Sequence, residues 1–134
     1  MLKQSAPRIP LDRLVHINYI VVIMKQPTSL GEFEQIVLLA ILRLDQEAYG
    51  TAIRAEIGRC TGREIAPGAL YTTLDRMEEK GMVNSRMGEA TPQRGGRAKR
   101  YFALTKKGRE ALVNAQRAYQ SLLAGLNLLG GHHA

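Results

Sequence analysis

The sequence predicts a mainly α-helical fold with one small β-hairpin and a separate C-terminal helix. Apolar residues recur at three- and four-residue steps in four segments, which is typical of helices that bury one face. Between the third and fourth segments, apolar and polar residues alternate beside a tip that contains Gly95 and Gly96, as expected for a hairpin. A chain of 134 residues, of which 45% are hydrophobic, is long enough to bury one core.

Two helices are predicted in the first part of this domain. The first covers residues 30–45, and Glu32 and Glu34 lie in its first turn, where the positive end of the helix dipole favours carboxylates. The second covers residues 49–59 and is followed by a loop rich in turn-forming residues. The residues expected to face the core from these helices are Phe33, Ile36, Val37, Ala40, Ile41, Leu44, Ala52, Ile53 and Ile57.

The third predicted helix begins at Pro67 and ends at Gly81, which is expected to adopt a left-handed conformation. Ala66 precedes the helix and has no side-chain oxygen to cap it, so packing must hold this end. Leu70, Leu74 and Met77 form the inward side. The residues on the opposite side are small or polar. Such residues allow a helix to approach DNA closely and to form hydrogen bonds with base edges. Its residues are Gly68, Thr72, Asp75, Arg76 and Glu79, with Ala69 and Thr73 beside them.

The hairpin is predicted to be strongly cationic. Its strands cover residues 82–87 and 101–104, and Phe102 and Leu104 are expected to face inward. Positions 61–109 hold eleven Lys or Arg and five Asp or Glu, so most of the chain's net charge of +7 lies on the hairpin and its flanks. The cations around the tip are Arg86, Arg94, Arg97, Lys99 and Arg100, against a single acid, Glu89.

A short helix beside a cationic hairpin is the arrangement of a winged helix-turn-helix, so the sequence predicts DNA binding. The helix would enter a groove, and the hairpin, or wing, would contact phosphates. An ordinary solvated charged loop is the alternative for the tip. Five cations within fifteen residues favour phosphate contacts over that alternative.

The last predicted helix begins at Thr105, whose hydroxyl is expected to cap it, and Gly130 and Gly131 are expected to end it. Its apolar residues follow alternating three- and four-residue steps, the spacing of a coiled-coil seam. This seam could pack back on the first helix, but that helix already uses its apolar face in the core, so a second copy is favoured. The predicted dimerisation residues are Leu112, Ala115, Tyr119, Leu122, Leu126 and Leu129.

These elements divide the chain into an N-terminal extension (1–27), a winged-helix DNA-binding domain (28–104) and a C-terminal dimerisation helix (105–129). Residues 14–24 form an apolar run that is interrupted by His16 and Asn18 and lacks a signal-peptide cleavage site. The run is too short to cross a bilayer as a helix, so no membrane association is predicted. Because the patterned domain begins only after Met24, we interpret residues 1–23 as an appendage or a mis-assigned upstream start, with translation starting at Met24.

The sequence contains no pattern typical of catalysis or of a metal site. It has no phosphate-binding loop, no Cys/His cluster and no nucleophile motif. We interpret Glu78 and Glu79 as a solvated helix end, Cys60 as a half-buried helix-end residue, and residues 132–133 as a solvated histidine tail. A single cysteine suits a reducing compartment. The prediction is a cytoplasmic protein that is not an enzyme and that binds no cofactor or metal.

Four stretches of the chain, in this order, resemble the PadR family of bacterial transcriptional regulators over residues 29–112. They are LGEFEQIVLLAIL (30–42), AYGTAIRAEI (48–57), GALYTTLDRMEEKGMV (68–83) and RGGRAKRYFALTKKGREAL (94–112). Each stretch alone is weak evidence, but together they are specific. The resemblance implies a winged helix-turn-helix that dimerises through its C-terminal helix and usually represses a neighbouring gene or operon. A single helix after the wing is typical of the smaller subfamily.

By this resemblance, Tyr71 corresponds to a family tyrosine near the phosphate backbone, although packing at the core edge explains it equally well. Two departures matter. Ala66 stands where a capping Ser or Thr is common, and the absence of Trp gives no support for the stacked-aromatic drug pocket of some relatives. The residues predicted to contact DNA are Gly68, Ala69, Tyr71, Thr72, Thr73, Arg76, Arg94, Arg97, Lys99 and Arg100.

The leading hypothesis is a homodimeric repressor that binds a pseudo-palindromic operator in double-stranded DNA. The alternative is an effector-sensing receptor, which would bind a small molecule at the dimer seam and use DNA binding as its readout. A winged helix used only for protein contacts is disfavoured by the many cations of the wing.

Overall fold

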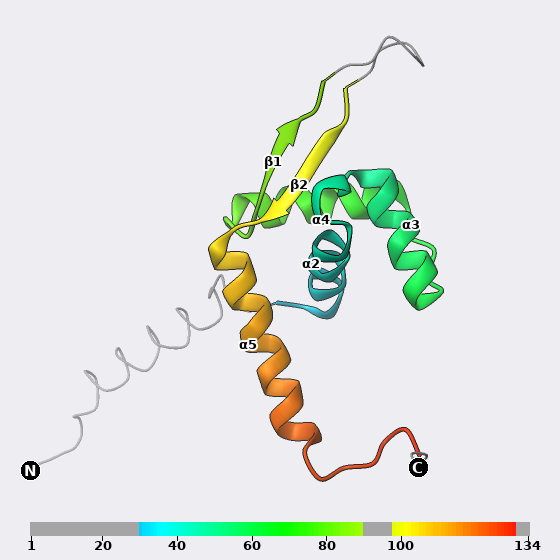
Figure 1. Ribbon diagram of the computed structural model, residues 1–134, viewed down its shortest axis with the longest axis vertical. Helices are drawn as coiled ribbons and strands as arrows, with labels where there is room; N and C mark the ends of the chain where they lie inside the picture. Colours follow the sequence, from blue (N-terminus) through cyan, green and yellow to red (C-terminus); the bar gives the residue numbers. More distant parts are fainter. Residues whose placement is uncertain (1–29, 90–97, 131–134) are drawn as a thin grey trace, which may run out of the picture.

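The computed structural model describes residues 30–89 and 98–130 of the chain. Figure 1 shows a helical body, with the hairpin projecting from one end and a long helix from the other. The N-terminal extension with Met24, the wing residues Arg94 and Arg97, and the histidine tail lie outside the described residues. The elements, in order, are α2 (Glu32–Leu44), the 3-10 turn η1 (Asp45–Glu47), α3 (Gly50–Thr61), α4 (Pro67–Glu79), β1 (Val83–Met87), β2 (Arg100–Leu104) and α5 (Lys106–Leu123).

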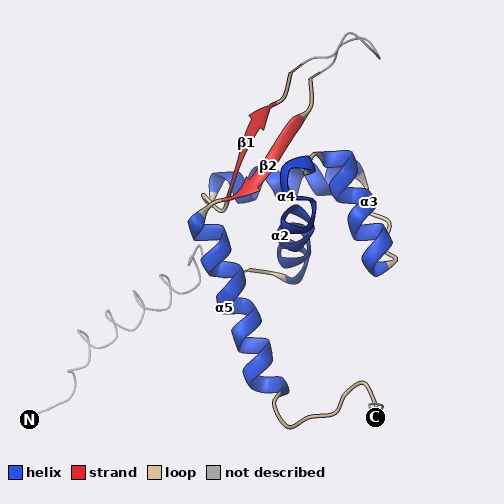
Figure 2. Cartoon of the chain, viewed as in Figure 1, coloured by secondary structure: helices blue, strands red, loops and turns tan. Residues whose placement is uncertain are grey.

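The predicted fold class is confirmed, since the elements are helices apart from one two-stranded antiparallel hairpin (Figure 2). Helix α2 lies centrally and contacts α3, α4 and α5. No helix in the part of the chain that the structure describes is long and apolar enough to cross a membrane.

The core contains most of the side chains that the helical spacing predicted. Ile53, Ile57, Leu70, Leu74 and Met77 are buried, as expected. On α2 the buried face is wider than predicted, because the central position of this helix places neighbours on several sides. Leu38, Glu34 and Gln35 are therefore buried, whereas Phe33, Ile36 and Leu44 lie only partly buried at the rim.

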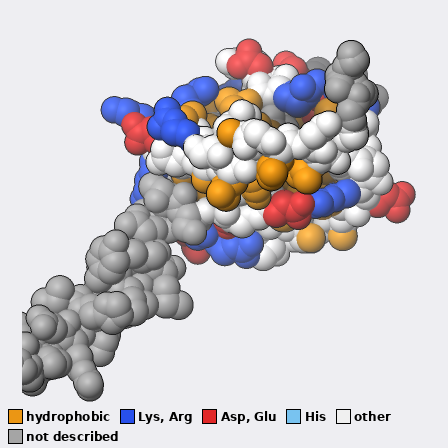
Figure 3. Space-filling view, turned by 90° about the horizontal axis from the view of Figure 1, so that it is seen from below, with side chains coloured by type: hydrophobic (Ala, Val, Ile, Leu, Met, Phe, Trp, Pro, Cys, Tyr) orange, Lys and Arg blue, Asp and Glu red, His pale blue; other side chains and the backbone are white. Residues whose placement is uncertain are grey.

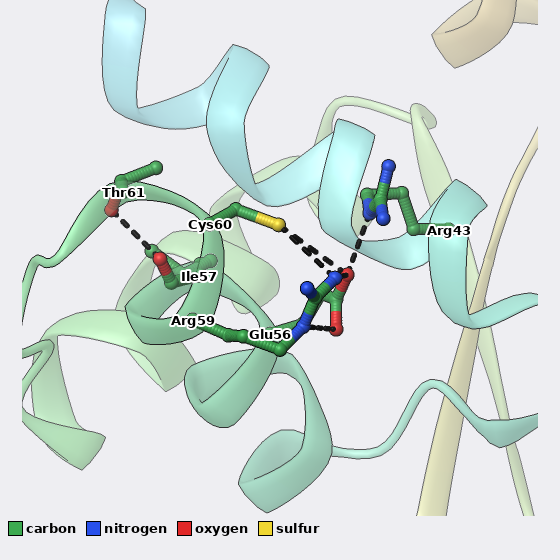
Figure 4. Close-up of polar contacts among 6 residues, drawn as sticks. All are labelled: Arg43, Glu56, Ile57, Arg59, Cys60 and Thr61. Carbon is green, nitrogen blue, oxygen red and sulfur yellow. Dashed lines mark hydrogen bonds and ion pairs between the residues drawn. The ribbon is translucent and has the colours of Figure 1, made fainter.

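Helices α2 and α3 are joined by a charged cluster at the surface (Figure 4). Arg43 Nε and Arg59 Nη2 each lie 2.6 Å from Glu56 Oε2. Hydrogen bonds from Arg59 and then from Arg43 lower the pKa of the Glu56 carboxyl to about 2. Cys60 beside them is exposed, so the expectation of a half-buried residue is wrong; its thiol lines the open groove between α2 and α3 rather than the core.

The hairpin pairs Ser85 with Phe102 and Arg86 with Tyr101. The Phe102 N–H also donates to the Ala48 carbonyl at 2.8 Å, which ties the outer edge of β2 to the segment before α3. Because side chains alternate along a strand, Phe102 faces the core whereas Tyr101 lies on the other face of the hairpin. The hairpin is thus attached to the helical body through both strands, since β2 contacts α2 and η1 while β1 contacts α4.

The predicted ends of two helices are confirmed. Gly81 follows α4 with a left-handed φ of 78°. The Thr105 hydroxyl accepts a hydrogen bond from the Gly108 N–H at 3.0 Å, as expected for a cap, and donates to the Gly81 carbonyl at 2.6 Å. Gly108 packs so closely on the chain before β1 that an added Cβ would lie 2.0 Å from the Met82 carbonyl oxygen.

Helix α5 is shorter than predicted. It ends at Leu123, and the expectation that it continues to Gly130 is wrong. Gly125 adopts a φ of 82°, which a continuing helix does not allow, and the Leu126 N–H turns back to the Leu123 carbonyl at 2.9 Å. Leu126 and Leu129 therefore lie beyond the helix on which the seam was predicted.

The predicted seam is divided between two environments. Leu112 is buried in the core of its own chain, which corrects its assignment to dimerisation, whereas Ala115 is only half-buried and its assignment stays a prediction. Tyr119 and Leu122 are 49% and 78% exposed. Figure 3, which looks from the side of the free end of α5, shows hydrophobic side chains gathered on this face.

Candidate nucleic-acid interface

The outward face of α4 has the composition that the sequence predicted. Gly68, Ala69, Thr72 and Arg76 are exposed. Thr73 is the exception, because it is only 4% exposed. It lies three residues after Leu70 and four before Met77, so the helical period places it on their buried side. The prediction that Thr73 faces DNA is therefore wrong.

The N-terminal end of α4 opens towards solvent. Ala66 precedes the helix in an extended conformation, and within the described residues no side chain caps this end. The first turn has no acidic residue, so the positive end of the helix dipole is not offset locally. Such an end favours a phosphate or another hydrogen-bond acceptor.

Arg54 fixes the approach to this helix end. Its Nε donates to the Ile65 carbonyl at 2.6 Å, so α3 holds the loop that leads into α4. The sequence analysis missed this residue, because no local pattern indicates that an arginine on α3 meets a carbonyl in the next loop.

Glu34 holds the other end of α4 against α2. Its carboxylate accepts from the Gly31 N–H at 3.0 Å and lies 3.1 Å from Lys80 Nζ and 3.6 Å from Arg76 Nε. Burial raises the pKa of Glu34, but the Gly31 hydrogen bond and the two cations outweigh burial and leave the pKa lowered. The sequence placed Glu34 in the first turn but missed its contact with α4. Glu34 lies three residues after Gly31, which is the spacing of a capping box. This spacing could have indicated the hydrogen bond between Gly31 and Glu34, but not the contact of Glu34 with α4.

Tyr71 packs at the edge of the core while 39% of it remains exposed. Its ring covers Gly50, where an added Cβ would lie 1.9 Å from the Tyr71 hydroxyl oxygen. This contact with Gly50 supports the core-edge interpretation of Tyr71, although the residue is exposed rather than half-buried, and its contact with a phosphate stays a prediction.

One face of the wing combines cations with aromatic rings. The Arg86 guanidinium lies 4.5 Å from the centre of the Tyr101 ring, and Lys99 Nζ lies 4.1 Å from that of Tyr49. The two rings meet edge to face, with centroids 5.6 Å apart. Lys99 is exposed, as a phosphate contact requires. The sequence analysis did not single out either tyrosine.

Arg100 has a different environment from the other described wing cations. Its guanidinium turns onto α4, where Nη2 lies 2.5 Å from Glu78 Oε1 and Nη1 lies 3.3 Å from Asp75 Oδ1. Glu78 is thus half-buried and paired, so the interpretation of this residue as part of a solvated helix end is wrong. The sequence predicted Arg100 as a phosphate contact, but the structure shows it bound to its own chain.

The described residues contain no group of His, Cys, Asp and Glu that could hold a metal ion. What the structure does bring together is the exposed face of α4, its open N-terminal end and the wing. A helix offering small and hydrogen-bonding side chains, with a β-hairpin fixed beside it, defines the class of winged helix-turn-helix DNA-binding proteins.

The chain belongs to the PadR-like family of transcriptional regulators, whose family model matches residues 38–114. This result confirms the resemblance found in the sequence. The transcriptional regulator Rv3488 of Mycobacterium tuberculosis is 36% identical over 87 residues, which cover 65% of this chain and 75% of that protein.

Solved structures agree with this assignment. A PadR-like transcription factor from Bacteroides fragilis has a TM-score of 0.57 and 25% identity, with 69% of this chain and 84% of that chain covered. A PadR-like transcriptional regulator from Bacillus cereus has a TM-score of 0.59 at 22% identity, with 74% and 92% covered, and supports the fold. The protein is therefore a DNA-binding transcriptional regulator of the PadR-like family.

Proposed function

We propose that this regulator acts as a homodimeric repressor that binds a pseudo-palindromic operator near its own gene or a neighbouring operon. The observation that carries the proposal is the coexistence of two surfaces on one chain. The face of α4 beside the wing suits DNA, and the apolar free half of α5 suits a second copy.

In this proposal α4 enters the major groove, where Gly68 and Ala69 allow close approach and Thr72 and Arg76 face base edges. Tyr71, Lys99, Arg94 and Arg97 would contact phosphates, which set the position of the protein on the duplex. The outward exposure of Thr72 and Arg76 supports the first assignment, and the exposed Lys99 supports the second. Arg94 and Arg97 are included among the proposed phosphate contacts because of their positive charge alone.

Dimerisation is supported by the free half of α5. Tyr119, Leu122 and Leu123 continue the stripe that Leu112 begins, yet in the described part of the chain they remain exposed. Contiguous exposed apolar residues on a helix are typical of a protein interface. Two copies joined there would present two α4 helices, which matches an operator with two related half-sites.

One observation favours the effector-sensing alternative. An open apolar hollow of about 380 Å³ lies between α2 and α5 and is lined by Leu39, Leu112, Val113, Gln116, Arg117 and Gln120. Because it adjoins the proposed dimer face, a second copy could close it over a small apolar molecule.

The decisive experiment combines binding with expression. Fluorescence anisotropy would compare the protein's own promoter with a scrambled duplex, with and without cell extract, and transcripts of the neighbouring genes would be measured in a deletion strain. We expect tighter binding to the promoter and raised transcripts after deletion. Lowered transcripts would replace repression with activation, equal binding to both duplexes would reject sequence specificity, and release of DNA by the extract would favour the receptor alternative.

A further inference from the structure

All three nitrogens of the Arg100 guanidinium contact the protein's own side chains. Nη2 binds Glu78 and Nη1 binds Asp75, both on α4. Nε donates to the Ser85 hydroxyl at 3.2 Å, and that hydroxyl donates in turn to Glu78 Oε2 at 2.9 Å. The guanidinium carbon, Cζ, lies 4.8 Å from the centre of the Phe102 ring. The side chain thus joins both strands of the wing to α4.

This contact set needs an arginine. A planar guanidinium can bind two carboxylates and a hydroxyl in different directions while stacking on a ring, which a lysine ammonium cannot reproduce. The Arg100 and Glu78 side chains are 35% and 34% exposed, so water screens the pair less than it would on an open surface. The geometry therefore favours a fixed connection between the wing and α4.

Arg100 also changes the charge of the face that α4 presents. Asp75, Glu78 and Glu79 lie on this helix, and carboxylates next to DNA would repel its phosphates. A single arginine placed between Asp75 and Glu78 offsets that repulsion from within the protein. A phosphate could recruit Arg100 only by breaking its contacts with both carboxylates.

The preceding residue provides the contrast. Lys99 extends from the wing over the Tyr49 ring and is exposed, whereas Arg100 turns to the opposite face of the hairpin and onto α4. Two adjacent cations on one strand thus have different surroundings.

We propose that Arg100 is a positioning residue. It fixes the wing relative to α4 and thereby sets which DNA sites can engage both elements at once, rather than contacting a phosphate itself. This inference rests on the proposed use of α4 and the wing in DNA binding. Arg100 would therefore affect how well the protein discriminates between its operator and other DNA. A misplaced wing weakens binding most at the operator, because the operator is the site that the fixed arrangement of wing and α4 fits best.

The test compares Arg100→Met with Lys99→Met, since each removes one positive charge and keeps an unbranched stem. Without DNA, hydrogen exchange of the hairpin backbone is measured by mass spectrometry. Arg100→Met should raise the exchange rate in β1 and β2 about tenfold, because charge-assisted hydrogen bonds are lost, and Lys99→Met should not. Equal exchange in Arg100→Met and the wild type would overturn the positioning role whether or not the protein binds DNA.

With DNA, affinity for operator and scrambled duplex is measured at several salt concentrations. Arg100→Met should lower the operator-to-scrambled ratio about tenfold and leave the salt slope unchanged, whereas Lys99→Met should weaken both duplexes and lower the slope by about one counterion. Glu78→Gln should likewise reduce discrimination. If Arg100→Met lowers the slope and leaves the ratio intact, Arg100 is a phosphate contact.

Discussion

The two ends of the molecule are organised in different ways. At the wing end, Arg100 binds carboxylates of α4, and Glu34 holds Lys80 at the C-terminal end of α4. At the other end, α5 projects from the helical body (Figure 1), and its Tyr119 and Leu122 side chains are 49% and 78% exposed. Polar groups are paired within the chain at one end, while apolar groups are left open at the other. The wing end is thus organised within one chain, and the opposite end presents the apolar face that we propose binds a second copy.

Helix α5 contains the same contrast within one element. Its first half buries Gly108, Ala111 and Leu112, whereas its second half begins with the half-buried Ala115 and Gln116 and, among the described residues, has none that is fully buried. The apolar stripe nevertheless continues through Tyr119 and Leu122. Since burying a large apolar side chain contributes about 1.5–3 kcal/mol, this continuation is costly to leave in water and favours association.

The largest expected effect comes from breaking the open end. Tyr119→Asp combined with Leu122→Asp would place carboxylates opposite one another across a two-fold interface, at a cost of several kcal/mol. We expect a folded monomer by light scattering with circular dichroism, and operator affinity reduced by at least about 100-fold, because each half-site would bind separately.

The matched control is Asn114→Asp combined with Ser121→Asp. These changes add the same two charges to exposed positions on the other side of α5, so the control should remain a dimer. If the Tyr119/Leu122 variant also stays a dimer with undiminished operator binding, the stripe on α5 is not the interface.

The next effect concerns the junction between the two ends. Gly108→Ala would place a Cβ 2.0 Å from the Met82 carbonyl oxygen, which is backbone and cannot turn away, so α5 would have to move from the base of the wing. We expect a loss of about 1–3 kcal/mol in the free energy of unfolding, measured with denaturant. Gly68→Ala meets no atom within 4 Å and should leave stability equal or higher. Equal stability of the Gly108 variant and the wild type would show that this junction adjusts freely.

The sequence was most informative where local spacing determines burial. Leu70, Leu74 and Met77 follow the helical period, so both the buried side of α4 and the exposure of Thr72 and Arg76 could be predicted. Thr73 was misassigned because its hydroxyl suggested a polar surface, although its angle on the helix places it inside. The burial of Thr73 was thus determined by its position on the helix and not by its residue type.

Contacts between distant segments could not be predicted in the same way. Arg100 lies 22 residues from Glu78, and a cation on a hairpin suggests solvent or phosphate until the tertiary fold brings α4 beside it. Arg54 and Ile65 are a similar case. The end of α5 was misjudged for another reason: the apolar spacing continues to Leu129, but Gly125 adopts a left-handed φ and stops the helix. Glycine is the usual residue at such a position and was the available indication.

The contrast between Thr72 and Thr73 provides a smaller but sharper test of the DNA-facing end. Thr72→Ala should leave the free energy of unfolding unchanged and relax preference at particular base pairs, costing about 1–2 kcal/mol on the operator and little on scrambled DNA. Thr73→Ala alters a buried side chain, so it should lower stability by about 1 kcal/mol and leave the operator-to-scrambled ratio unchanged. The measurements are denaturant titration and anisotropy on both duplexes. The opposite pattern would mean that the two threonines have been assigned to the wrong sides.

The smallest expected effect lies in the charged cluster that joins α2 to α3. The folded-state pKa of Glu56 is lowered from 4.5 to about 2 by hydrogen bonds from Arg59 and Arg43, so the ionised form is favoured by folding. A lowered pKa adds stability that is complete above about pH 4.5 and is lost as the pH falls towards 2. Glu56→Gln should therefore be less stable than the wild type at pH 7, and the difference should shrink steadily on acidification through that window.

In a background of Arg43→Gln and Arg59→Gln, the same substitution should have little effect at any pH, because the carboxylate has lost both donors. A wild-type advantage that stays constant from pH 7 to pH 2 would show that the cluster does not stabilise the fold through the charge of Glu56.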